Sequence, residues 1–288
     1  DGLNMLSIIL SQSGDAPKAI EILEKAVEIN PRNADYFNNL GQLYKGEGKL
    51  SDAIKAYSLA IKIRPNFSEA HSNYGNVLSL SGDTKSADLH YNLAIKSNPE
   101  NIAAHYNLAT SLSLRSEHSE AIKSFRSIIN IIPDHYEAHN NLAFSLHEQG
   151  SIDDALKHLE RALQINPKFS AAHANLGNIF FKLSDWEKSL KYFKEASVND
   201  LNRVDAWIGL GNTQSIIGKT NDAMVSYRKA VDIEPNNGDA LSALCNQLMN
   251  VCAWEELAIK LDLFESTEAK SKKSEIKCIL DSFTFEER

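Results

Sequence analysis

Residues 33–65 read NADYFNNLGQLYKGEGKLSDAIKAYSLAIKIRP, and this stretch contains two helical patterns separated by a turn. Phe37, Leu40 and Tyr44 are spaced by three and four residues, which is the spacing of one face of an α-helix. A second helix is expected at about residues 51–63, ahead of the helix-breaking Pro65. Each helix exposes an apolar face when alone, so we expect the two to pack together as an antiparallel hairpin.

The ends of these two helices carry suitable capping residues. Asn33 is a favoured N-cap, because its side-chain oxygen accepts a hydrogen bond from a free backbone N–H of the first turn. Gly48 suits the left-handed backbone conformation that commonly follows a helix. Gly41, Ala53 and Ala60 are small, which lets the two helices approach closely.

The hairpin recurs with a period of 34 residues. All prolines except Pro17 keep this spacing: Pro31, Pro65, Pro99, Pro133, Pro167 and Pro235. The last interval is twice the period, and Leu201 occupies the position where a proline is missing. Turn glycines share the period, with Ser116 and Ser184 in the gaps: Gly14, Gly48, Gly82, Gly150 and Gly218. A column of alanines, broken by Ser189, does so as well: Ala19, Ala53, Ala87, Ala121, Ala155 and Ala223. Agreement of several columns on one period indicates an array of structural repeats.

The repeats define the predicted domain organisation. Seven units cover residues 1–237, a degenerate eighth unit or cap covers 238–264, and residues 265–288 are a charged linker toward a missing C-terminal region. One hairpin is too small to bury its own apolar face, and stacking against its neighbours buries it. The proline missing at Leu201 predicts a less regular seam at residues 184–203. The predicted fold class is all-α, a solenoid of stacked antiparallel helix pairs.

Composition disfavours several classes of protein. The 288-residue chain is 43% apolar with a formal net charge of −8, and an acidic chain is poorly suited to neutralising nucleic-acid phosphates. Its longest apolar runs are too short for a membrane span, and it opens with DGLNMLSIIL, without a basic leader. Three cysteines without a CxxC pair (Cys245, Cys252 and Cys278) favour a reducing compartment. We therefore expect a cytoplasmic protein, with the nucleus as an alternative, that binds neither nucleic acid nor membranes.

Four histidines keep the 34-residue spacing: His71, His105, His139 and His173. Neighbouring packed helices lie about 8–10 Å apart, whereas each ligand of one zinc ion lies about 2.1 Å from the metal. This histidine column cannot gather on one ion, and a packing role is expected. Neither a catalytic set of side chains nor a Gly-rich phosphate loop is evident, so the sequence predicts no catalytic residue, no metal and no cofactor.

Five asparagines also keep the period, and we call them the asparagine column: Asn39, Asn73, Asn107, Asn141 and Asn175. Positions four before and three after them share their helix face. We include these flanking residues in the candidate site: Asp35, Glu69, Glu137, Asn76 and Asn178, together with Asp205 and Asn212, which continue the flanks at Gly209, where the column ends. One interpretation is that the asparagines satisfy a neighbouring helix end or face water. We favour peptide binding, because a carboxamide offers a donor and an acceptor that match an extended backbone.

These columns resemble the tetratricopeptide repeat family, whose pattern is Trp-x2-Leu-Gly-x2-Tyr, then Ala-x3-Phe, then Pro. The second unit follows it with Phe37, Leu40, Gly41, Tyr44, Ala53, Tyr57 and Pro65. The seventh follows it with Trp207, Leu210, Gly211, Ala223, Tyr227 and Pro235, and has Gln214 in place of Tyr. The histidine column occupies the Trp position. The resemblance implies a right-handed solenoid whose first helices line a concave groove, and hence a protein–protein interaction scaffold that binds extended segments.

Two features are similar to the repeat superhelix of the O-linked N-acetylglucosamine transferases. One is the asparagine column. The other is LCNQLMNVCAWEEL (residues 244–257), with Cys252 and Trp254, which is similar to the segment that precedes that family's catalytic region. The resemblance implies a substrate-recruiting part of a UDP-GlcNAc-dependent glycosyltransferase, without a catalytic site of its own. The alternative is a free-standing adaptor with no enzymatic domain. A homodimer through the convex face is a further expectation.

Overall fold

The computed structural model describes residues 2–253, 255–257 and 259 of the chain. These residues form α-helices joined by short turns and contain no β-strand. Contacts divide the chain into two compact units, residues 1–150 and residues 151–288, and each is described by itself. The prediction of an all-α fold is confirmed.

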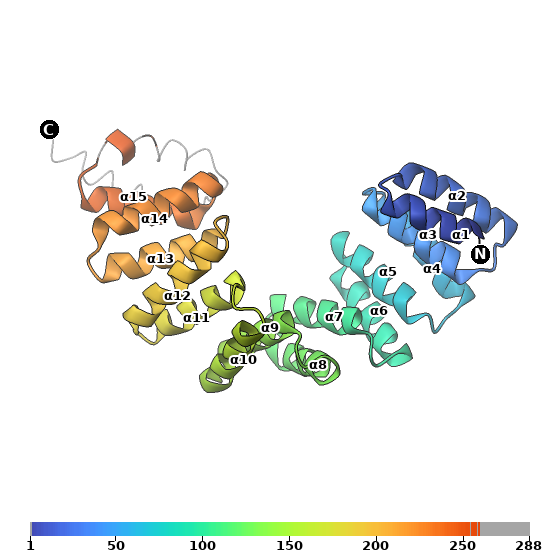
Figure 1. Ribbon diagram of the computed structural model, residues 1–288, viewed down its shortest axis with the longest axis horizontal. Helices are drawn as coiled ribbons and strands as arrows, with labels where there is room; N and C mark the ends of the chain where they lie inside the picture. Colours follow the sequence, from blue (N-terminus) through green and yellow to red (C-terminus); the bar gives the residue numbers. More distant parts are fainter. Residues whose placement is uncertain (1, 254, 258, 260–288) are drawn as a thin grey trace. The chain divides into compact units, whose positions relative to one another are not determined.

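The described part of the first unit consists of helices α1 to α9 (Figure 1). We call the odd-numbered helices of the chain first helices and the even-numbered ones second helices. Consecutive helices pack as pairs, and the second helix of each pair packs against the next first helix. The bounds are α1 Gly2–Gln12, α2 Ala16–Ile29, α3 Ala34–Gly46, α4 Leu50–Ile63, α5 Ser68–Leu80, α6 Thr84–Ser97, α7 Ile102–Leu114, α8 His118–Ile131 and α9 Tyr136–Glu148.

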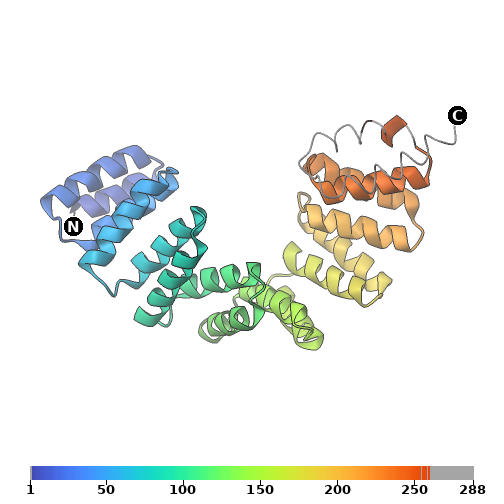
Figure 2. The ribbon, with the colours of Figure 1, turned by 180° about the vertical axis from the view of Figure 1, so that it is seen from behind.

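The second unit follows the same plan. Figure 2, which shows the ribbon from behind, lets the reader follow its helices side by side in chain order. Helix α11 pairs with α12 and α13 with α14, while α15 packs on α14. The bounds are α10 Ile152–Ile165, α11 Ser170–Lys182, α12 Trp186–Asn199, α13 Val204–Ile216, α14 Thr220–Ile233 and α15 Gly238–Asn250.

The helix ends match the capping residues that the sequence predicts. The Asn33 side chain accepts hydrogen bonds from the backbone N–H groups of Asp35 (3.0 Å) and Tyr36 (3.4 Å). Gly48 has a φ of +72°, in the left-handed region that favours glycine. Ser116 and Ser184 fill gaps in the glycine column and adopt the same conformation, with φ of +62° and +59°. These two serines are therefore held in a backbone conformation that costs a non-glycine residue energy.

Paired helices pack closely because glycine on the first helix faces an aromatic ring on the second. A Cβ added at Gly41 would lie 2.7 Å from the Tyr57 ring, and one at Gly75 would lie 2.6 Å from Tyr91. The Tyr57 and Tyr91 side chains are only 0% and 2% exposed, so neither ring has space to move aside. The close approach predicted at Gly41 is confirmed.

Some predictions concern residues outside the described part of the chain. These are Trp254, Cys278, the linker 265–288 and most of the second half of the eighth unit. Helix α15 lies where the eighth unit is predicted to begin. The limits of the individual repeats stay a prediction.

Candidate functional site

The asparagine column lies on the first helices. Asn39, Asn73, Asn107 and Asn141 belong to α3, α5, α7 and α9 of the first unit, and Asn175 belongs to α11 of the second. All five side chains are half-buried. This degree of burial is intermediate between a core residue and a freely solvated one.

Most of the column in the first unit makes hydrogen bonds between repeats. Nδ2 of Asn39 donates to Oδ1 of Asn4 (2.8 Å), and Nδ2 of Asn73 donates to Oδ1 of Asn38 (3.0 Å). Nδ2 of Asn141 likewise donates to the Tyr106 hydroxyl (3.0 Å). Each acceptor lies 35 residues earlier, on the preceding first helix. Sequence reasoning missed these links, although polar residues directly before the column positions were a signal for them.

Part of the carboxamide chemistry remains available. The Asn107 side chain makes no hydrogen bond within the described residues, and the Asn73 side-chain oxygen accepts none there. The Asn141 oxygen accepts a hydrogen bond from Asn140 (2.9 Å), and the Asn39 oxygen accepts a longer one from Asn38 (3.4 Å). A ligand would therefore find an unused amide donor and acceptor at Asn107 and an unused acceptor at Asn73.

Three hollows open between first helices of the first unit. The α1/α3 hollow (about 370 Å³) is bordered by Asn39 and Gln42. The α5/α7 hollow (about 270 Å³) is bordered by Asn107, and the α7/α9 hollow (about 400 Å³) by Asn141. A member of the asparagine column thus stands at the edge of each hollow. We call the surface that contains these three hollows and the asparagine column the first-helix face.

The carboxylates of the first unit differ in how far they are neutralised. Asp35 forms two hydrogen-bonded ion-pair contacts with Arg64, at 2.6 and 3.1 Å, and this carboxylate raises the pKa of the guanidinium. Glu137 lies 3.2 Å from the His135 ring. Glu69 is exposed and makes no hydrogen bond or ion-pair contact within the described residues, although its charge also contributes to raising the pKa of Arg64. Of these three predicted site residues, Glu69 is the most accessible to a cationic ligand.

In the second unit, Asp205 is the predicted carboxylate. Arg203 holds it at 3.0 Å, so part of its charge is already neutralised. Asp205 borders a hollow of about 500 Å³ together with Glu234 and Asp239. This surface of the second unit is therefore mainly acidic.

The flanking asparagines divide into two kinds. Asn76 accepts a hydrogen bond from the Tyr91 hydroxyl (3.4 Å), and Asn212 accepts one from the Tyr227 hydroxyl (2.9 Å). Both therefore connect a first helix to the second helix of the same hairpin. Asn178 is exposed and makes no hydrogen bond within the described residues, so it is the freest of the three.

The column ends for a steric reason. Gly209 occupies the next position, and a Cβ added there would lie 2.3 Å from the Phe193 ring. The ring is only 1% exposed and also lies against Gly177, where an added Cβ would come within 2.8 Å. Phe193 therefore leaves no room for an asparagine at position 209.

The histidine column has the packing role that its spacing predicts. Nε2 of each of its four histidines lies 2.9–3.0 Å from the carbonyl oxygen of the proline six residues earlier. A carbonyl only accepts hydrogen bonds, so Nε2 must carry the proton. The four rings are buried, at 3–9% exposure. These nitrogens hold the turn between units and are not available to a ligand.

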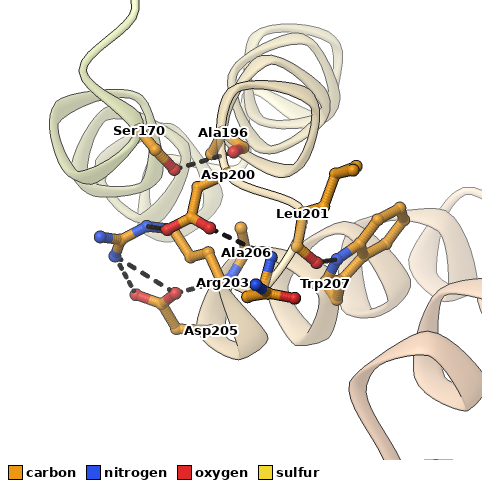
Figure 3. A network of polar contacts seen from close by, with 9 residues as sticks. Ser170, Ala196, Asp200, Leu201, Arg203, Asp205, Ala206 and Trp207 are labelled. Carbon is orange, nitrogen blue, oxygen red and sulfur yellow. Dashed lines mark hydrogen bonds and ion pairs between the residues drawn. The ribbon is translucent and has the colours of Figure 1, made fainter. Parts of the chain in front are cut away.

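Trp207 shows the same arrangement in the seventh unit (Figure 3). Its indole N–H donates to the carbonyl of Leu201 (3.0 Å), again six residues earlier. In the same turn Arg203 contacts Asp200 (3.8 Å) and Asp205 (3.0 Å). In the four units of the histidine column, histidine thus supplies the N–H that tryptophan supplies here. No helix within the described ranges is both long and apolar enough to cross a bilayer.

Paired helices repeated every 34 residues, with a polar column along the first helices, define a helical-repeat protein. The tetratricopeptide repeat pattern matches residues 34–67 and 204–237, and a TPR repeat pattern matches residues 9–48 and 145–184. These matched stretches are accordingly tetratricopeptide repeats, a class whose stacked units present extended binding surfaces. No curated protein matches it significantly.

Several solved structures share the fold of this chain. The chain is similar to the structure described as APC/C hetero-tetramer Cut9-Hcn1, with a TM-score of 0.68 and 19% identity over 84% of this chain. It spans 48% of the length of that neighbour. A tetratricopeptide repeat protein from Parabacteroides merdae has a TM-score of 0.67 and 18% identity, over 86% of this chain and 98% of its own. PilF from Pseudomonas aeruginosa has a TM-score of 0.62 and 16% identity, over 73% and 95%. At these identities the likeness concerns the fold alone.

Proposed function

We propose that the chain is an interaction scaffold that binds extended segments of other proteins along the first-helix face. The observation that carries the proposal is the unpartnered Asn107 amide at the edge of the α5/α7 hollow, with the Asn73 oxygen free on the preceding first helix. An extended peptide has alternating N–H and C=O groups that need partners. A carboxamide donates and accepts at once, and so suits a main chain of any sequence.

The column has two roles in this proposal. The links of Asn39, Asn73 and Asn141 to the preceding repeat hold neighbouring first helices in register. The Asn73 oxygen and the Asn107 amide then meet the ligand from helices whose spacing is already set. Such preorganisation raises affinity because less freedom is lost on binding.

The proposed cellular role is recruitment of protein substrates for a protein O-GlcNAc transferase. The asparagine column and residues 244–257 support it. The alternative is a free-standing adaptor. The Parabacteroides merdae protein, covered over 98% of its length, is a repeat array of comparable extent without a large further domain in that chain. The coding sequence after Arg288 separates the two proposals, because only the first requires a glycosyltransferase domain there.

Replacement of Asn107 tests the binding role. We expect Asn107→Ala to weaken binding of unstructured, fluorescein-labelled peptides by the equivalent of about 0.5–1.5 kcal/mol per lost hydrogen bond, or roughly 2- to 12-fold. Stability should be unchanged or rise by up to about 0.7 kcal/mol, since alanine is the better helix former. Anisotropy titration measures the first quantity and urea unfolding the second.

Asn130→Ala is the matched control, because Asn130 is exposed on the second helix α8. It should leave peptide affinity at the wild-type value. Equal affinity of the Asn107→Ala variant and the wild type would assign the column to repeat packing alone. Sedimentation of the wild-type chain tests the predicted homodimer in the same preparation.

A further inference from the structure

One aromatic side chain interrupts the polar flank of the asparagine column. Three residues after each column member stand Gln42, Asn76, Thr110, Phe144 and Asn178. Phe144 on α9 is 43% exposed, and Leu114 at the end of α7 is 82% exposed. Both border the α7/α9 hollow. Two large apolar side chains are therefore presented to solvent at one place on the first-helix face.

The hollow has an apolar floor. Phe125, which is 0% exposed, forms part of it, and the His118 ring meets Phe144 edge to face with 6.0 Å between ring centres. The tyrosines at the same position of the two preceding second helices, Tyr57 and Tyr91, carry a hydroxyl that Phe125 lacks. The volume of about 400 Å³ is at the lower end of the range of about 300–1,000 Å³ for ligand pockets. One or two side chains would fill it.

Charge around the hollow is negative. Glu148 borders it, and none of the described residues lining it is lysine or arginine. Arg115 follows Leu114 directly, but its guanidinium is engaged by Asp88 (2.6 Å) and Glu117 (2.8 Å).

Carboxylates also mark the other edge of the first-helix face. Glu137 lies seven residues before Phe144 on α9, about 10 Å along the helix axis. Glu69 lies near the start of α5 and is exposed. The first-helix face of the first unit thus has an acidic edge at the helix starts and an apolar edge at the ends of α7 and α9. The asparagine column runs between them.

An extended peptide laid over the asparagine column would direct successive side chains to opposite edges, because side chains alternate along a strand. We propose that the α7/α9 hollow takes a bulky apolar side chain of such a segment, and that the neighbouring residues of the segment are lysine or arginine facing Glu69 and Glu137. This inference rests on the proposed function. It deepens that function by naming the class of sequence that the scaffold selects.

The test uses nine-residue fluorescein-labelled peptides of alternating serine and lysine, whose central residue is phenylalanine, leucine or serine. We expect the wild-type chain to bind the first two at least about tenfold more tightly than the third. Phe144→Asn, which installs the residue found at Asn178 and Asn212, should reduce this ratio to about one. Binding of the serine-centred peptide should be retained. Exchange of lysine for glutamate in the peptides should weaken all of them.

Leu89→Asn is the control for loss of an exposed apolar side chain, because Leu89 is 59% exposed on the second helix α6. It should keep the wild-type preference. If Phe144→Asn does not fold by circular dichroism, Leu114→Ser removes the opposite wall and should give the same loss.

The outcomes distinguish failure of this inference from failure of the proposed function. A wild-type chain that binds the phenylalanine- and serine-centred peptides equally would overturn this inference and leave the proposed function standing. Failure to bind any of the peptides would overturn both. A wild-type dimer that Phe144→Asn converts to a monomer in sedimentation would assign the hollow to self-association, which also contradicts the inference.

Discussion

Restoring the asparagine column at Gly209 should destabilise the protein. An added Cβ would lie 2.3 Å from Cε1 and 2.4 Å from Cζ of Phe193, a ring that is 1% exposed. Overpacking of a filled core typically costs about 1–3 kcal/mol. Asparagine is a better helix former than glycine by only about 0.3 kcal/mol, so the cost of overpacking should exceed this gain. We expect Gly209→Asn to lower the free energy of unfolding by about 1–3 kcal/mol.

The assay is urea and thermal unfolding followed by circular dichroism. For a chain of this size each kcal/mol corresponds to roughly 2–4 °C in Tm, so the expected shift is roughly 2–12 °C. Gly46→Asn is the matched control, because nothing lies within 4 Å of a Cβ added at that helical glycine. That variant should unfold within about 0.5 kcal/mol of the wild type.

A second substitution locates the cause. Phe193→Leu in the Gly209→Asn background should recover part of the loss, with a coupling energy of about 0.5–3 kcal/mol. If Gly209→Asn and Gly46→Asn were equally stable, the steric explanation for the end of the column would be wrong.

Three further predictions concern stability. Ser116→Gly should stabilise the chain by up to about 1 kcal/mol because the φ of +62° strains a non-glycine residue, whereas Gly82→Ser should do the reverse; chemical denaturation measures both. Leu201→Pro should raise the free energy of unfolding by about 0.4–1 kcal/mol. The Leu201 N–H donates no hydrogen bond among the described residues, and the preceding residue is extended, so proline fits there. Equal hydrogen-exchange protection of residues 184–203 and 120–133 in the wild type would contradict the predicted weak seam. Burial and the nearby His71 lower the pKa of His90 below 6.5, so the unfolded chain binds more protons and stability should fall as the pH drops through about 6.5; His90→Gln should show a smaller loss between pH 7.5 and 5.5.

The repeated helices could be predicted from the amino-acid sequence alone. Spacings of three and four residues in the stretch 33–65 predict the two helices, and the 34-residue period repeats them along the chain. Asn33 and Gly48 mark helix ends because capping depends on the backbone within a few residues. The packing role of the histidine column was also predictable, since the period alone separates its members. Helix spacing and capping depend on residues close together in the chain, and the repeats depend on a regular period. Both kinds of pattern can be recognised in the amino-acid sequence.

Which side chains of the candidate site have partners depends on how the helices stack. Asn73 meets Asn38, and Asp35 meets Arg64, because stacking brings different helices to hydrogen-bonding distance. Asn107 belongs to the same sequence column, but its side chain has no such partner among the residues that the structure describes. Whether an amide is structural or free for a ligand therefore depends on the neighbouring helix, whose side chains a periodic pattern does not place.

Contacts between helices also produce the α7/α9 hollow and the end of the asparagine column. Phe144 is visible in the sequence as an exception in a polar column, but its exposure and its neighbour Leu114 follow from the packing of α7 against α9. Gly209 is visible as a missing asparagine, but the reason is the Phe193 ring from α12. Steric exclusion acts between atoms a few ångströms apart in space, and here those atoms belong to different helices. The sequence shows which positions recur every 34 residues. The contacts between helices determine which side chains at those positions are free to bind.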